Sequence, residues 1–174
     1  IVSTAGTRMM CPGWAGLRAI LTPRRSSVVI GDFQIETVPV SHDANEPIAV
    51  IVTSIEEGTR AGIVYDLGHV TEGVSRTLDK LDILVLEANH DEGMLRTGPY
   101  TPSVQRRIGG NFGHLSNRAA GQCERQNIRT GLSDLVLARR SEQGQQPQPG
   151  VRPGCAATPQ QGSEWIRKES IANK

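Results

Sequence analysis

The stretch AGIVYDLGHVTEGVSRTLDKLDILVL, residues 61–86, decides the fold class. It opens and closes with apolar runs of strand length, at 61–65 and 82–86. Between them Thr71 is a good N-cap, and the apolar residues of 71–81 recur at the spacing of one helix face. Strand, helix and strand in this order predict an α/β fold.

Further strand-like runs lie upstream, at 28–30, 33–40 and 48–55. Gly31 and Asp32 join the first two runs, and a two-residue connection that contains glycine is typical of a β-hairpin. The runs are continuously apolar instead of alternating between apolar and polar residues. Continuous runs predict strands that are covered on both faces.

The remaining elements are shorter. Residues 14–21 predict a short helix. Ser116 or Asn117 is suited to cap a helix that continues through 118–120. Residues 132–138 predict a last strand, which continues the alternation of strands and helices.

The chain changes character after residue 142. Of the 20 residues in 143–162, 14 are Gln, Pro or Gly, a composition too poor in apolar groups to order itself. Residues 164–166 are a short apolar return that is able to dock on the domain. We therefore expect a domain at 1–142, a disordered segment at 143–163 and a tail at 164–174.

Composition sets outer limits on function. The net charge is +1, which gives no general electrostatic attraction to nucleic acid or membranes but leaves room for a local phosphate site. No apolar run approaches the length of a membrane span, and the first residues lack the pattern of a signal peptide. The three cysteines show no paired spacing, which argues against a zinc ribbon or a disulfide framework and favours a reducing, cytoplasmic location.

Four polar residues follow apolar, strand-like segments, and each is a candidate for chemistry: His42, Asp66, His90 and His114. Loops at strand ends are where open metal sites are built, because rigid strands aim the loop side chains toward one point. Each residue also has an ordinary structural interpretation, as a surface or turn histidine or as an Asp that caps a turn. No His-x-His or His-x-x-x-His pair accompanies them, so the chain shows only part of a metal site.

Basic and glycine-rich segments leave alternatives open as well. Arg106 and Arg107 form either a phosphate clamp or a solvated surface pair. His114 directly precedes the predicted helix, where its ring could reach a phosphate or satisfy a local carbonyl group. The glycines of 109–113 are not followed by Lys-Ser or Lys-Thr, so they predict turns and not a phosphate loop.

Taken in order, these runs resemble metallo-β-lactamase-fold hydrolases, in the bacterial branch near ribonuclease Z and the phosphoribosyl cyclic phosphodiesterases. Some members of that branch act as DNA exonucleases. The resemblance covers residues 1–142 and is specific between 28 and 120. The segments that carry it are 38–47, 65–71, 84–95, 98–100, 106–108 and 113–120.

The resemblance implies a partial αββα sandwich with a site for two zinc or manganese ions at one edge of the sheets. The implied activity is hydrolysis of a phosphodiester substrate, nucleic acid or nucleotide-like, with no membrane partner. His42 matches a metal ligand and Asp66 the bridging carboxylate. His114 matches a catalytic histidine that assists the phosphate or the leaving group, and His90 a histidine near the site.

Two departures from the family pattern limit these expectations. The principal His-x-His-x-Asp-His motif belongs upstream of Ile1, and Arg139 stands where the final ligand histidine is expected. Guanidinium stays protonated and cannot donate to a metal. The sequence thus predicts an incomplete metal site with weak or no activity, and an uncovered sheet prone to self-association. The alternatives are a non-catalytic phosphate- or nucleic-acid-binding remnant and a gene fragment without function.

Overall fold

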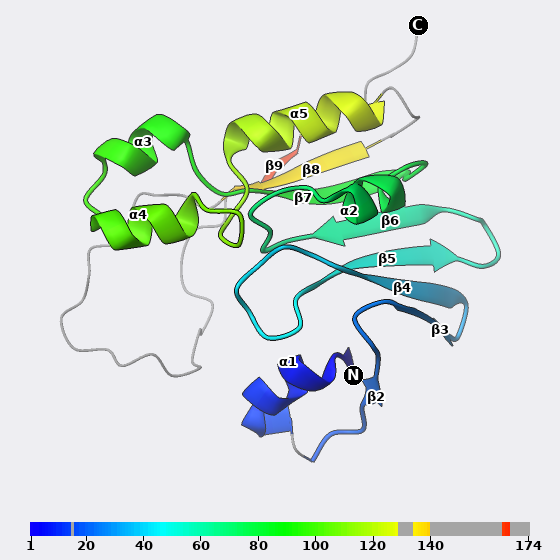
Figure 1. The fold of residues 1–174 in the computed structure, drawn as a ribbon. Helices are drawn as coiled ribbons and strands as arrows, with labels where there is room; N and C mark the ends of the chain where they lie inside the picture. The colour runs from blue at the N-terminus through cyan, green and yellow to red at the C-terminus, as the bar shows by residue number, and fades with distance from the viewer. Residues whose placement is uncertain (15, 129–133, 140–164, 168–174) are drawn as a thin grey trace, which may run out of the picture.

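A mixed seven-stranded sheet forms the centre of the molecule (Figure 1). The computed structural model describes residues 1–14, 16–128, 134–139 and 165–167. Within them the strands of this sheet follow one another in chain order: β3 (Ser26–Ile30), β4 (Phe33–Pro39), β5 (Ile48–Ser54), β6 (Arg60–Val64), β7 (Ile83–Ala88), β8 (Asp134–Arg139) and β9 (Trp165–Arg167). The predicted strands are therefore present, and no predicted bound is more than two residues from the observed one.

The sheet changes from antiparallel to parallel at its centre. Strands β3 to β6 form an antiparallel meander, and β6, β7 and β8 are parallel. The first hairpin turns at Gly31, whose φ of 57° suits a residue without a side chain. Helices α2 (Glu72–Thr77), α3 (Glu92–Thr97), α4 (Pro102–Ile108) and α5 (Asn117–Ile128) lie in the connections of the parallel part.

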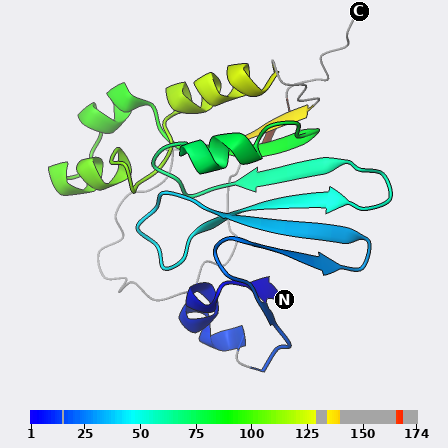
Figure 2. The same cartoon turned by 45° about the vertical axis from the view of Figure 1, so that its right-hand side comes forward.

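Helices α2 and α5 cover one face of the sheet, while α3 and α4 lie beyond its end (Figures 1 and 2). Thr71 caps α2 as predicted, because its side chain accepts a hydrogen bond from the Val74 backbone N–H. The helix is shorter than the predicted 71–81, but Leu78 and Leu81 stay in the core as expected. Apolar residues of both helices and the facing strands make one cluster: Val38, Val40, Ala49, Ile51, Val64, Leu67, Val74, Leu78, Leu81, Leu84, Leu86, Ala88, Leu115, Ala120 and Cys123.

The opposite face of the sheet is apolar and partly exposed. Phe33 is 50% exposed and Ile63 47%, and the cross-strand neighbours Val50 and Val85 of Ile63 are only half-buried. The prediction that the strands are covered on both faces is therefore wrong for the described part of the chain. Its reason is physical: the strands carry apolar residues on both sides, but the helices pack against only one of them.

The N-terminal segment differs from the sequence prediction. The helix expected at 14–21 is absent from the described residues of that stretch, where Pro12–Trp14 is a short 3₁₀ turn and Ile20–Leu21 is strand β2. A helix that the sequence analysis did not predict, α1 (Ala5–Met10), lies earlier, and Thr4 caps it by accepting a hydrogen bond from the Thr7 backbone N–H. Strand β2 pairs in parallel with β1 (Val2–Ser3) in a separate two-stranded sheet.

The C-terminal part of the chain contributes one described strand to the sheet. Strand β9 pairs antiparallel with β8. It contains residues 165 and 166 of the apolar return predicted at 164–166, and residue 164 lies outside the described residues. The disordered segment predicted at 143–163 lies outside the described residues. None of the helices in the described part of the chain is both long and apolar enough to span a membrane.

Candidate metal centre

Three predicted site residues meet at one edge of the sheet. Strands β4, β6 and β7 run in the same direction, so the loops after them leave the same edge. His42 lies in the loop after β4, Asp66 in the loop after β6, and His114 in the loop that leads into α5. One potential ligand atom from each of these three residues lies within 4.8 Å of the others.

His42 is mostly buried and held by its own loop. Its side chain is 12% exposed, and its Nδ1 accepts a hydrogen bond of 3.0 Å from the Ala44 backbone N–H. The His42 ring meets the His114 ring edge-on, with the centroids 5.1 Å apart. Arg107 Nε donates to Asp43 Oδ2 at 2.6 Å, which fastens the His42 loop to α4. This hydrogen bond is the main cause of the lowered pKa of Asp43.

Asp66 adopts an unusual backbone conformation directly after β6. Its φ is 52°, in the left-handed region, which Asp tolerates better than most residues. The next backbone N–H, that of Leu67, donates to the buried Glu87 carboxylate at 3.2 Å. The chain therefore turns sharply here and leaves the Asp66 side chain 63% exposed, at 3.6 Å from His114 Nδ1.

Glu87 fixes the orientation of His114. The Glu87 side chain is buried at the end of β7, and its Oε1 lies 2.7 Å from His114 Nδ1. Its Oε2 accepts from the backbone N–H groups of Leu67 and Leu115 at 3.2 and 3.3 Å. A carboxylate in that position favours the tautomer with the proton on Nδ1, which leaves Nε2 of His114 for chemistry.

The sequence pattern did not single out Glu87, although a signal for it existed. A carboxylate at the end of the most apolar strand has to find several donors if it is buried. Glu87 finds them in His114, two backbone N–H groups and Asn89, whose amide donates to Oε1 at 3.2 Å.

A close approach of three loops holds this edge of the sheet together. The Gly68 N–H donates to Ser41 O at 2.7 Å, and Ser41 Oγ donates to Asn111 O at 2.7 Å. His69 Nδ1 is also 3.1 Å from Asn111 O, outside the three-residue donor group. A Cβ atom at Gly68 would lie 2.3 Å from Asn111 O, so only glycine fits between these loops.

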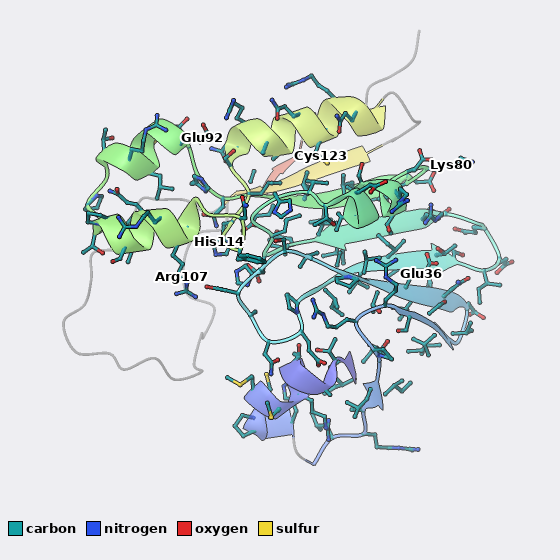
Figure 3. The ribbon with its side chains drawn as sticks, viewed as in Figure 1. Glu36, Lys80, Glu92, Arg107, His114 and Cys123 are labelled. Carbon is teal, nitrogen blue, oxygen red and sulfur yellow. The ribbon has the colours of Figure 1, made fainter. Side chains whose placement is uncertain are left out.

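The other predicted residues lie around the donor group and not within it. His90 is buried, and its carbonyl accepts from the Asn117 N–H at 2.8 Å, so its backbone anchors the start of α5. Arg107 pairs with Asp43 and does not form a clamp together with Arg106, which lines a neighbouring cavity. Figure 3 shows His114 between α4 and the end of the sheet. Strand β8 ends at Arg139 beside Ala88, at this same edge.

The donor set fits a divalent metal ion. Two imidazole rings and one carboxylate, from His42, His114 and Asp66, are ligand types that zinc takes in catalytic sites. Such a site has three protein ligands and one open position. His42 and Asp66 are the two metal ligands that the sequence predicts, and His114 is the third member of the group.

Solved structures identify the fold. No model of a known protein family matches the chain. The metallo-β-lactamase-fold protein YhfI from Bacillus subtilis aligns over 79% of this chain and 50% of its own, with a TM-score of 0.53 and 14% identity. This chain has part of the metallo-β-lactamase fold. Zn²⁺-bound PqqB from Methylobacterium extorquens aligns over 66% of this chain and 45% of its own, with a TM-score of 0.53 and 15% identity.

A curated protein is similar to this chain in sequence as well. Exodeoxyribonuclease YycJ from Bacillus anthracis is 32% identical over 111 residues, which are 64% of this chain and 41% of the relative. The chain thus spans about two fifths of the length of this relative. These findings confirm the predicted α/β fold class and the predicted family resemblance.

Proposed function

We propose that this chain forms part of a metal-dependent phosphodiester hydrolase that acts on nucleic acid. The observation that carries the proposal is the convergence of His42, Asp66 and His114, with His114 fixed by the buried Glu87. The similarity to an exodeoxyribonuclease supports DNA as the substrate class. In this proposal His42 and Asp66 hold zinc or manganese, and His90 supports the start of α5 behind the site.

The metal and His114 would have separate tasks. A divalent ion held there would supply Lewis-acid chemistry for a phosphoryl group and would lower the pKa of water. His114 carries the proton chemistry: its Nδ1 stays bonded to Glu87, so Nε2 is the atom that faces the substrate. In this step the ring carries a proton on both nitrogens: when the phosphorus–oxygen bond breaks, Nε2–H gives its proton to the leaving oxygen, Nδ1–H stays bonded to Glu87, and water later returns a proton to Nε2.

The number of ligands limits the expected activity. A catalytic zinc ion needs three protein ligands, and a two-metal site needs several more. The described residues offer three donors in one group, and the guanidinium of Arg139 cannot be a fourth. We therefore expect these 174 residues alone to bind less than two equivalents of metal and to hydrolyse phosphodiesters slowly.

Metal titration tests the ligand assignment. We expect up to one equivalent of Zn²⁺ or Mn²⁺ by calorimetry, with binding weakened at least about tenfold in His42→Ala and in Asp66→Ala. His69→Ala is the matched control, because this exposed histidine lies nearby but outside the donor group. Metal binding that is indifferent to both site variants would remove His42 and Asp66 from the site.

Hydrolysis tests the reaction. The substrate is a short end-labelled single-stranded DNA, incubated with added Mn²⁺ or Zn²⁺. We expect slow cleavage that a chelator abolishes and that falls roughly 100-fold or more in His114→Ala, within the range typical of a lost general acid. Glu87→Gln should reduce the rate while metal stays bound, because Glu87 positions His114. Metal binding without any cleavage would instead favour the non-catalytic phosphate- or nucleic-acid-binding alternative.

A further inference from the structure

A cavity of about 530 Å³ opens next to His114, between the sheet edge and helices α3, α4 and α5. His114 lies on its wall, so the cavity begins where the proposed chemistry takes place. Its lining combines the apolar Leu95 and Ala119, the polar Gln105 and Ser116, and the basic Arg96 and Arg106. This volume is in the range of cavities that hold small organic ligands.

The two arginines of the lining come from different helices and are held on a common support. Arg96 lies in α3 and Arg106 in α4, and both side chains are exposed. Gln105 Nε2 donates to the backbone carbonyls of Arg96 and Tyr100, at 3.3 and 3.0 Å. This amide ties the start of α4 to the end of α3 and so fixes the spacing of the two guanidinium-bearing segments.

The charge balance of the cavity favours an anion. Its one carboxylate, Glu92, is 2.9 Å from Arg118 Nη2 and accepts a hydrogen bond from Ser116 Oγ at 3.1 Å. The hydrogen bond from Arg118 is the main cause of the lowered pKa of Glu92, so this carboxylate stays ionised and paired. In the described part of the chain, neither Arg96 nor Arg106 has an ion pair within 4 Å.

We propose that this cavity binds the nucleotide on the leaving side of the scissile phosphodiester. Arg96 and Arg106 bind the far phosphate of that nucleotide, and its sugar and base pack against Leu95 and Ala119. Guanidinium groups match phosphate oxygens in geometry as well as in charge. The inference rests on the proposed function, because it is His114 that links the cavity to the reacting phosphate.

The test is binding of deoxyadenosine monophosphate to the full chain, with a chelator present and no metal. We expect saturable binding by calorimetry, together with NMR shifts of the backbone amides of Gly109, Ser116 and Ala119. The double variant Arg96→Ala/Arg106→Ala should weaken binding roughly tenfold or more, since each change removes a charge-assisted hydrogen bond. Arg76→Ala is the charge-matched control, because Arg76 lies on α2 and pairs only with Glu72.

Other probes and outcomes separate the possibilities. Deoxyadenosine and inorganic phosphate should each bind at least about tenfold more weakly than the nucleotide, since each engages half of the cavity. Phosphate that binds as tightly as the nucleotide overturns the nucleotide assignment. If the nucleotide does not bind, the nucleotide assignment is overturned too. It is also overturned if binding is unchanged in both double variants, Arg96→Ala/Arg106→Ala and Arg96→Lys/Arg106→Lys. Arginine-dependent binding without any hydrolysis of DNA upholds the cavity as a nucleotide site while the proposed function fails.

Discussion

The two faces of the central sheet are built from the same kinds of residue but have different surroundings. Ile51 lies on the face under α2 and α5 and is 0% exposed, while Ile63, one strand away, lies on the other face and is 47% exposed. Both belong to β-branched, continuously apolar runs. Apolar composition alone therefore does not determine which face becomes the core. The helices determine it, because they supply the second layer that burial requires.

The open face also bears on the family comparison. The chain spans 41% of the length of the exodeoxyribonuclease to which it is similar. In the described residues the helices cover one side of the sheet, which is half of the layered arrangement that the family resemblance implies. The apolar character of the second face is then what would be expected of a surface that packs against a further layer.

The strongest test of this comparison replaces the same residue type on each face. Ile51→Ala should lower the free energy of unfolding by about 3 kcal/mol, because it opens a cavity in a fully buried cluster. Ile63→Ala should lower it by less than about 1 kcal/mol, because the side chain is already half in water. Urea unfolding followed by circular dichroism measures both. Equal losses would mean that the second face is covered in solution.

Adding volume should lower the stability more on the covered face than on the open face. A Cβ atom at Gly62 would lie 2.6 Å from Leu81 Cδ1 and 3.2 Å from Ile51 Cδ1, so Gly62→Ala overfills the covered face. We expect it to cost about 1–2 kcal/mol. Ala61→Val places its added methyl groups on the open face, and we expect a change of less than about 0.5 kcal/mol. Thermal unfolding of the two variants compares them, and a Gly62→Ala protein as stable as Ala61→Val would contradict the packing described.

The fold could be predicted from sequence wherever one local signal sufficed. The turn at Gly31, the Thr71 cap and the strand at 82–86 each depend on a few neighbouring residues, and each is present. The helix predicted at 14–21 failed because Ile20 and Leu21 pair with Val2 and Ser3 as strand β2, a contact between distant residues. Burial of both sheet faces failed because burial depends on which layers pack together, and a strand sequence does not specify its covering.

The site followed a similar division. Position after a strand brought His42 and Asp66 together, because β4 and β6 run in the same direction and deliver their loops to one edge. His114 follows helix α4 and not a strand, and it joins them through the loop that leads into α5. Position after a strand did not separate His90 from these residues. The backbone carbonyl of His90 binds the start of α5 instead. The role of Glu87 depends on a contact with His114, 27 residues away. Such a contact follows from the fold and is not visible in local spacing.

The open face should also govern self-association. Phe33→Ser and Ile63→Ser together remove two half-exposed apolar side chains from that face without touching the covered cluster. We expect association between copies to weaken at least about tenfold, since less apolar surface is buried on contact. Sedimentation velocity over a concentration series provides the measurement. Unchanged association would place the contact elsewhere, and a monomeric wild-type protein would overturn the expected self-association itself.

The smallest expected effects lie in α3 and α4, which cover neither face of the sheet. Asp91 caps α3 by accepting from the Gly93 and Met94 N–H groups, whereas Thr101 at the start of α4 makes no such side-chain bond. Asp91→Ala should therefore lower Tm by a few degrees and Thr101→Ala by almost nothing.

The hydrogen bonds from Met94 and Gly93 are the main causes of the lowered pKa of Asp91. A carboxylate with a lowered pKa in the folded state stabilises the protein above its ordinary pKa of 3.8, and that contribution is lost as the pH falls through the lowered value. The Tm difference between wild type and Asp91→Ala should accordingly be constant near neutral pH and shrink below pH 3.8, whereas a difference that persists in acid would mean that the carboxylate is not the capping group.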